Sequence, residues 1–231
     1  MKKLLLFSRR AVIFFCTFSF LLVLVYRWLP VSFTPLMFFR EATCSAGVKH
    51  EWVPLEKISN QLQLAVVSTE DQNFLHHHGF DFGAIRTAMD EAEDGGRRRG
   101  GSTISQQTAK NVFLWPSSSF VRKGFEAWFT VLIELTWSKR RIMEVYLNSV
   151  EFGKGIYGCE AASEFFFRKH ASALGQDEAA RLAVVLPNPI RYNVAKPGAY
   201  MQKRKSWAIS QMNNLGGKLL YGDEQDVKSR K

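Results

Sequence analysis

The first quarter of the chain holds one long apolar run between short polar segments. Residues 11–26 are almost entirely apolar, and four basic residues precede them. This run falls a little short of the roughly 20 residues that span a bilayer, but Trp28 and Leu29 extend it along the lipid interface. The pattern predicts a basic tail over residues 1–10 and a transmembrane helix over residues 11–29.

A cleaved signal peptide has the same charge pattern and is the alternative interpretation of this segment. No small-x-small cleavage site follows the apolar run directly, which favours an uncleaved anchor. Because basic flanks stay in the cytoplasm, the residues after Phe39 are expected on the outer side of the membrane. Pro30 and Pro35 should break any continuing helix, so we expect a membrane-proximal linker over residues 30–50 and a single globular domain over residues 51–231.

The rest of the chain has a helical pattern. From Leu55 onward, apolar side chains recur every three to four residues, most clearly before Glu70 and within residues 120–137 and 160–167. Alternating strand patterns are scarce. The sequence therefore predicts a mainly α domain with two lobes and a cleft between them. Residues 90–101 are acidic and then basic, with four glycines, and predict a loop that is either a lid or plainly exposed.

Composition adds an anionic partner and a lipid-facing surface to this picture. The net charge of +10 suits a phosphate-bearing ligand or a membrane surface, as well as general surface basicity. The 19 phenylalanines and six tryptophans indicate either a large aromatic core or, as we favour, an outer helix within residues 112–137 that dips into lipid. Nucleic acid is disfavoured as a partner, because the aromatic residues have helical spacing. The three cysteines have no metal-ligand spacing; a Cys44–Cys159 bridge is compatible with the sequence but not indicated by it.

Two polar segments, residues 70–81 and 100–111, carry the candidate chemistry. Glu70 follows an apolar helix and precedes Asp71, so burial and a like charge should both raise its pKa. Glycosyl transfer and glycan hydrolysis both commonly use a pair of carboxylates. We therefore take Glu70 and Glu126 as the candidate catalytic residues.

Cations near these carboxylates predict a phosphate-binding function. Lys110, Arg122 and Lys123 could together hold a pyrophosphate. The turn at residues 100–103 leads into a helix and should offer free backbone N–H groups to the same anion. In a helix Arg122 lies one turn from Glu126, although an ordinary surface ion pair would fit that spacing equally well. The histidines at 76–78 are either a solvated turn or a metal patch, but adjacent side chains point apart, which disfavours chelation.

Five motifs occur in order between residues 70 and 193, and in them the chain resembles the peptidoglycan glycosyltransferase family, whose domain also opens bifunctional penicillin-binding proteins. The motif residues are Glu70, Asp71, Phe74, His77, Gly79 and Asp81; 100–111; Arg122, Lys123 and Glu126; Lys139, Ile142, Glu144, Tyr146, Leu147 and Asn148; and 181–189 with Arg191, Tyr192 and Asn193. The chain departs from the family pattern at Ser105, Met143 and Val194. It resembles the monofunctional branch, since Ser-x-x-Lys, Ser-Asp-Asn and Lys-Thr-Gly motifs are missing.

The resemblance implies a lysozyme-like fold and the polymerisation of lipid II, a disaccharide-pentapeptide on undecaprenyl pyrophosphate, into β-1,4 glycan with inversion. It implies Glu70 as the general base, and Glu126 as a group that either orients the cations or assists near the leaving group. The substrate-binding residues that it implies are Asp71, Phe74, His77, Ser102, Thr103, Gln106, Gln107, Lys110, Asn111, Arg122 and Lys123. Two rival functions stay open: a lysozyme-like glycan hydrolase and a non-catalytic lipid II-binding scaffold of the cell envelope.

The same resemblance gives expectations about cofactors, partners and location. No metal ligand and no tightly bound cofactor are expected, although Mg²⁺ or Mn²⁺ could stimulate the reaction. The expected partners are lipid II, the nascent glycan, membrane lipid, and penicillin-binding or division proteins. The expected location is the bacterial inner membrane, with one membrane pass and the catalytic domain on the periplasmic side.

Overall fold

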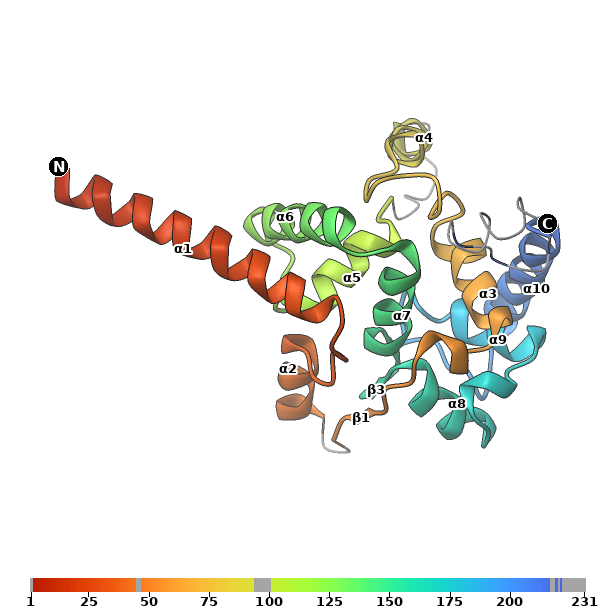
Figure 1. Cartoon of the computed structure of the whole chain (residues 1–231). Coiled ribbons are helices and arrows are strands. Elements are labelled where there is room, and N and C mark those ends of the chain that lie inside the picture. Colours follow the sequence, from red (N-terminus) through yellow and green to blue (C-terminus); the bar gives the residue numbers. More distant parts are fainter. Residues whose placement is uncertain (1, 45–46, 94–100, 217–218, 220, 222–231) are drawn as a thin grey trace, which may run out of the picture.

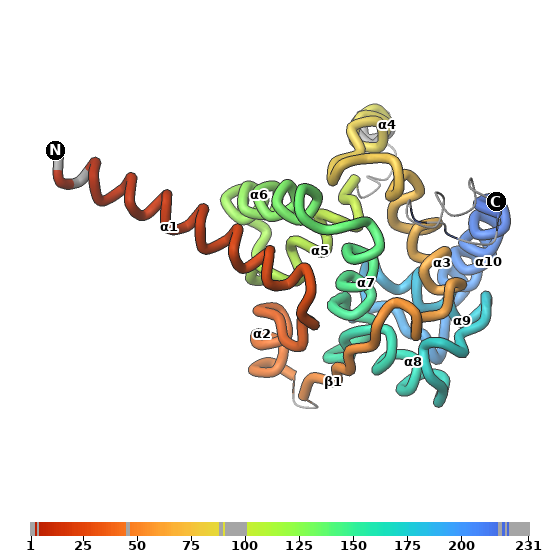
Figure 2. The backbone as a smooth tube through the Cα atoms, viewed as in Figure 1, coloured from red at the N-terminus to blue at the C-terminus, as the bar shows by residue number. Residues whose placement is uncertain are grey.

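The N-terminal helix extends away from the rest of the molecule (Figures 1 and 2). The structure is a computed structural model and describes residues 2–44, 47–93, 101–216, 219 and 221. Helix α1 spans Lys2–Tyr26, so the basic tail expected as a separate segment is helical. By length and composition, Leu5–Tyr26 could cross a membrane, with a mean hydropathy of 1.8.

Residues 30–50 contain more structure than the linker that the sequence predicts. Helix α2 spans Pro35–Thr43, and Thr34 caps it by accepting a hydrogen bond from the Met37 N–H at 3.2 Å. Helix α1 ends before both prolines, and Pro35 starts the new helix α2, because the first helical position needs no N–H donor. Arg40 of α2 then pairs with Glu151 at 3.0 Å, which fastens the segment to the main body.

The main body is helical, as the sequence predicts. Three short strands form one small sheet in the order β1-β3-β2, with β1 parallel and β2 antiparallel to β3. The helices of the body are α3 Asn60–Glu70, α4 Phe82–Glu93, α5 Ile104–Phe113, α6 Phe120–Thr136, α7 Lys139–Ser149, α8 Cys159–Phe167, α9 Gln176–Ala183 and α10 Ala199–Asn214, with 3₁₀ turns η1 Leu55–Lys57 and η2 Ala171–Ala173. The strands are β1 Lys49–His50, β2 Glu151–Gly153 and β3 Ile156–Tyr157.

The helices pack in two groups. Helix α3 packs against α9 and α10, whereas α5 packs against α6 and α7 (Figure 1). Fully buried side chains such as Leu62 in the first group and Ile133 and Ile142 in the second form the core. The carboxyl end of α3 meets the amino-terminal half of α5 at the junction of the two groups, and this is where Glu70 lies.

Helix α1 is fastened to the body by side chains of α6 and α7. The indole N–H of Trp128 donates to the Ser19 hydroxyl at 3.0 Å, and that of Trp137 donates to the Val23 carbonyl at 2.9 Å. The Arg141 guanidinium donates to the carbonyl of Tyr26 at 2.8 Å. These three bonds hold the last two turns of α1 against the body.

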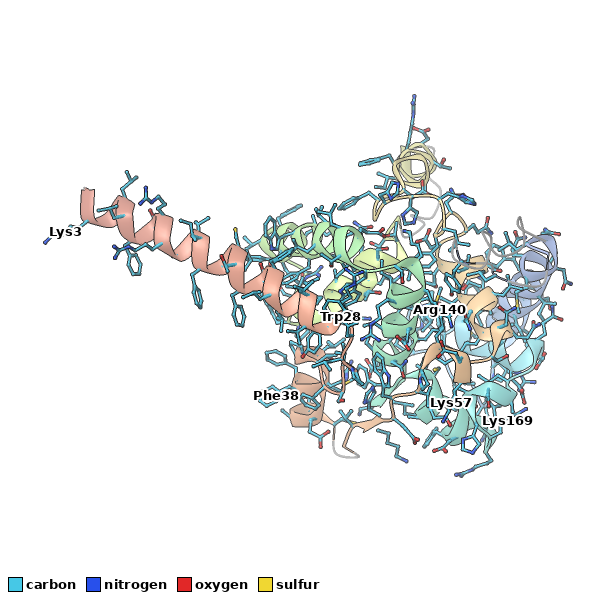
Figure 3. The ribbon with its side chains drawn as sticks, viewed as in Figure 1. Lys3, Trp28, Phe38, Lys57, Arg140 and Lys169 are labelled. Carbon is cyan, nitrogen blue, oxygen red and sulfur yellow. The ribbon has the colours of Figure 1, made fainter. Side chains whose placement is uncertain are left out.

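Much of the aromatic surplus lies on the surface beside α1. Phe120, at the start of α6, is 97% exposed, and Leu135, near its end, is 77% exposed. Trp28 follows the C-terminal end of α1 and Phe38 lies on α2, and both are exposed (Figure 3). The apolar outer helix expected within residues 112–137 is therefore α6.

The start of one expected loop is corrected, and the question of a Cys44–Cys159 bridge, which the sequence leaves open, is answered. Residues Asp90–Glu93 belong to the last turn of α4, so the loop expected over 90–101 starts later; its residues 94–100 lie outside the described part. Cys44 and Cys159 are buried free thiols, so the bridge between them is not formed.

Candidate active site

Glu70 is the last residue of α3 and faces α5. The Ser59 hydroxyl caps the start of this helix, and buried apolar residues along α3 fix its position against the core. One oxygen of the Glu70 carboxylate accepts a hydrogen bond from the Gln107 amide at 2.9 Å. The Tyr146 hydroxyl donates to the amide oxygen of Gln107 at 3.2 Å. Tyr146 therefore orients Gln107 so that its NH₂ group points at Glu70.

The surroundings of Glu70 tune it as a proton acceptor. Burial raises the pKa of the Glu70 carboxyl above its ordinary value, and the Gln107 hydrogen bond opposes that rise. The charges of Arg204 and Lys110 also oppose it, and Asp71 adds a smaller upward contribution. The upward shift and its main cause agree with the sequence prediction. A carboxyl with a raised pKa is better matched to taking a proton near neutral pH.

Asp71 and His77 hold the turn after α3 and do not face open space. The buried Asp71 carboxylate contacts the Nε2 atom of His77 at 2.9 Å and accepts a hydrogen bond from the Ile104 N–H at 2.9 Å. The Gly79 N–H donates to Nδ1 of His77 at 3.1 Å. In a neutral imidazole Nε2 then carries the hydrogen, and it donates a hydrogen bond to the Asp71 carboxylate. These bonds join the residues around 71–79 to the start of α5.

The backbone donors at the start of α5 are already used within the protein. Thr103 and Gln106 form a capping box, in which the Thr103 N–H donates to the Gln106 side chain at 3.0 Å and the Gln106 N–H donates to the Thr103 hydroxyl at 3.2 Å. The Ile104 N–H is taken by Asp71. The expectation that this turn offers free N–H groups to an anion is therefore wrong for these three groups.

Phe74 and Asn111 are also packing residues. Phe74 is fully buried, and the Lys139 ammonium lies 4.8 Å from its ring centroid. Asn111 is 4% exposed on the inner face of α5. The resemblance implies that both bind substrate, and with side chains this buried that role stays a prediction.

Three cations surround the second carboxylate. Arg122 contacts one oxygen of Glu126 at 2.8 Å, and Lys123 contacts the other. The Glu126 side chain is only 3% exposed, so this is not the ordinary surface ion pair that its spacing allows. Lys123 also lies 3.5 Å from the Ser102 hydroxyl. Burial lowers the pKa of Lys110, with Arg122 and Lys123 lowering it further and Glu126 opposing the change.

The structure adds a residue that sequence analysis missed, Glu134. It accepts hydrogen bonds from the Ser105 hydroxyl and, at 2.8 Å, from the Lys139 ammonium. A Cβ atom at Gly79 would approach Glu134 Cγ to 3.0 Å, and Gly79 has φ +89°, so only glycine fits here. The signal in the sequence is the spacing of eight residues from Glu126, which places both on one helical face.

Metal-ligating side chains gather elsewhere. In the ranges that the structure describes, the group close enough to hold a metal ion is Glu160, Glu164 and His170, on α8 and the segment after it. The histidines at 76 and 78 are exposed and belong to no such group among the described residues.

Fold and site together define a class of protein. A mainly helical fold of two helix groups carries, at their junction, a carboxyl with a raised pKa near Lys110, and Lys110 in turn lies near Arg122 and Lys123, which pair with a second carboxylate. This arrangement fits a glycosyltransferase that displaces a phosphate leaving group.

Comparison with known proteins gives the family. The transglycosylase family model matches residues 39–213, starting inside α2 and upstream of the domain boundary expected at residue 51. Three relatives are described as biosynthetic peptidoglycan transglycosylases. The one from Bacteroides thetaiotaomicron is 54% identical, covering 92% of this chain and 88% of its own length. The one from Pseudomonas putida is 48% identical over 90% of this chain and 90% of its own length. The one from Caulobacter vibrioides is 54% identical over 79% of this chain and 79% of its own length.

The chain therefore belongs to the transglycosylase family and is a peptidoglycan glycosyltransferase with a lysozyme-like helical fold.

Proposed function

We propose that the enzyme polymerises lipid II into linear β-1,4 glycan strands and releases undecaprenyl pyrophosphate. The observation that supports this most directly is that the site holds both a carboxyl with a raised pKa and a group of cations. Glu70 has a raised pKa and accepts a bond from a neutral amide, while Lys110, Arg122 and Lys123 supply positive charge nearby. A finished glycan carries no pyrophosphate, so a hydrolase would have no use for these cations.

In the proposed reaction Glu70 is the general base. Its carboxylate takes the proton from the 4-hydroxyl of the acceptor sugar as that oxygen attacks C1 of the donor. The new O–C1 bond forms while the bond from C1 to the phosphate oxygen breaks, and the electron pair leaves with the pyrophosphate. The attack inverts C1 and requires no covalent enzyme intermediate, because pyrophosphate is a good leaving group.

The proposed role of the cations is to neutralise the charge that develops on the leaving pyrophosphate. Lys110 is partly exposed, and Arg122 and Lys123 project from the first turn of α6. Glu126 is bound to both of them, so we assign it the orientation of these two side chains and not the transfer of a proton. Ser102 and Gln107, both partly exposed, would line the donor site beside them.

We also propose that α1 crosses the bacterial inner membrane and places the body on the periplasmic side. The basic residues at its start favour a cytoplasmic N-terminus. The exposed apolar residues Phe120, Leu135 and Phe38 lie on helices packed close to the foot of α1, where they would enter the lipid surface. Lipid II has its own lipid tail there, so the site would receive it without extracting it from the bilayer.

The proposal includes no tightly bound cofactor and no nucleic acid. Mg²⁺ or Mn²⁺ would act by binding the pyrophosphate of the substrate beside the three cations. Penicillin-binding proteins and division proteins that work at the same membrane would be the protein partners, and the nascent glycan would remain in the site as the next donor.

The test is the polymerisation of labelled lipid II by the purified full chain in detergent. We expect the wild type to form polymer that lysozyme digests, and Glu70→Gln to be slower by about 10²–10⁴-fold. Glu164→Gln is the matched control, since Glu164 is an exposed glutamate on α8. Shortening of finished glycan would support a hydrolase instead, and binding of lipid II without polymer would support a scaffold. A Glu70→Gln enzyme with near-normal polymerisation would remove Glu70 from the mechanism.

A further inference from the structure

Helix α10 brings a cation to Glu70 from the helix group that contains Glu70 itself. This helix packs against α3, which ends in Glu70, and the Gln72 amide donates to the Gln211 side chain of α10 at 3.2 Å. Arg204 on α10 lowers the pKa of Glu70 by a larger amount than Lys110 does. The cations of the site therefore come from two sides: Lys110 from the group of α5 and Arg204 from the group of α3, α9 and α10.

Arg204 is held in position without a protein anion. Its guanidinium carbon lies 3.7 Å from the ring centroid of Trp207, and the residue is partly buried. Among the residues that the structure describes, no carboxylate oxygen lies within 4.0 Å of an Arg204 nitrogen. The adjacent Lys205, in contrast, is paired with Asp177. A guanidinium stacked on an aromatic face keeps its edge N–H groups free for an oxyanion.

The geometry of inversion decides which substrate this cation can reach. In an inverting displacement the attacking oxygen and the leaving group lie on opposite sides of C1. The donor's pyrophosphate is assigned to Lys110, Arg122 and Lys123, which belong to the group of α5 and α6. The acceptor oxygen must therefore approach C1 from the side away from these cations, and Arg204 is a cation near Glu70 that belongs to the other helix group.

We propose that Arg204 is a substrate-binding residue of the acceptor, and that it holds an oxyanion of the incoming lipid-linked disaccharide while Glu70 takes the proton from its hydroxyl. This inference rests on the proposed function. The oxyanion is either a phosphate of the acceptor's own pyrophosphate or a carboxylate of its peptide stem, and both match the guanidinium edge.

The experiment separates donor from acceptor. A lipid-linked tetrasaccharide serves as a fixed donor, labelled lipid II as a varied acceptor, and the initial rate of hexasaccharide formation is measured. We expect Arg204→Gln to raise the apparent KM for lipid II about tenfold with a smaller change in kcat, and Arg204→Lys to restore part of the loss. Lys203→Gln is the matched control, because it removes the same charge from the adjacent, exposed position of α10.

A binding assay makes the result independent of turnover. Equilibrium binding of lipid II in detergent micelles should weaken for Arg204→Gln and not for Lys203→Gln, with equal thermal stability of the two variants. Loss of polymerisation by the wild type would reject the proposed function, whereas unchanged KM and binding in Arg204→Gln would reject this inference alone. A rise in the KM for the donor instead of the acceptor would also overturn it.

Two modified acceptors identify the oxyanion. If the peptide carboxylate is the ligand, amidating the stem carboxylates should remove the difference between wild type and Arg204→Gln. If the phosphate is the ligand, that difference should persist with the amidated acceptor and shrink with a monophosphate analogue. A difference that survives in both acceptors would mean that Arg204 acts only through the fold of α10.

Discussion

Glu70 and Glu126 are carboxylates of one site that are held in opposite ways. Glu70 accepts a hydrogen bond from the neutral amide of Gln107, and no lysine or arginine nitrogen of the described residues lies within 4.0 Å of its carboxylate. Glu126 is bound by Arg122 and Lys123, and its side chain is 3% exposed. The first carboxylate is free to gain a proton. The second is already neutralised by its partners, so it acts as part of the cation framework.

The largest effect that tests this comparison is on the kinetic constants. Glu70→Gln should lower kcat by about 10²–10⁴-fold with little change in KM, because it removes only the proton transfer. Glu126→Gln should instead raise the KM for lipid II about tenfold, because Arg122 and Lys123 lose the group that orients them. Both constants are measured from initial rates of polymerisation. If the two variants lose kcat alike, the carboxylates act as a pair and the comparison fails.

The pH dependence of the rate sharpens the role of Glu70. Since burial raises the pKa of its carboxyl, the rate should fall with decreasing pH at a value above the ordinary pKa of a glutamate, about 4.3. Gln107→Leu removes a hydrogen bond that lowers this pKa, so the acid limb of kcat/KM should move to still higher pH. Ser102→Ala, which leaves Glu70 untouched, should leave the acid limb in place. An acid limb that moves downward in Gln107→Leu would contradict the assignment.

The sequence predicts the helical fold and the state of one of the two carboxylates, Glu70. Helical periodicity was enough for α3 and α6, and an apolar helix ending at Glu70 was enough to predict a raised pKa. Sequence analysis failed where the answer depended on distant partners. Asp71 reaches the Ile104 N–H across 33 residues, and that contact uses one of the N–H groups expected to bind an anion. Arg204 stands in a basic run with no local feature that separates it from its neighbours.

The same limit applies to two points of local structure. The two prolines predict that the first helix does not continue, and α1 ends at Tyr26, but the sequence analysis does not predict that Pro35, after the capping residue Thr34, begins a new helix. The Arg122–Glu126 spacing fits a surface ion pair as well as a buried one. Burial of Glu126 follows from the packing of α5 against α6, which helical periodicity alone does not specify.

Glu126→Gln should destabilise the fold. The variant leaves Arg122, whose side chain is 12% exposed, without its charged partner. A hydrogen bond to a charged group contributes about 1.5–3 kcal/mol, and we expect a loss of unfolding free energy in that range. Urea denaturation in detergent, followed by tryptophan fluorescence, measures it. Glu178→Gln, which breaks a partly exposed pair with Lys169, is the control and should cost about 1 kcal/mol or less.

Glu70→Gln should have the opposite effect on stability and make the fold more stable near neutral pH. In the folded state the pKa of Glu70 is raised, so the fold is favoured when this carboxyl is protonated. Below the unfolded pKa both states are protonated and no stability is lost. As pH rises through the folded pKa, ionisation of Glu70 lowers the stability of the wild type, and the neutral glutamine avoids this loss. The Tm of Glu70→Gln should therefore exceed that of the wild type at pH 7.5 and approach it near pH 4. A variant less stable than the wild type at pH 7.5 would mean that the surroundings of Glu70 stabilise it as a carboxylate, and would contradict the raised pKa.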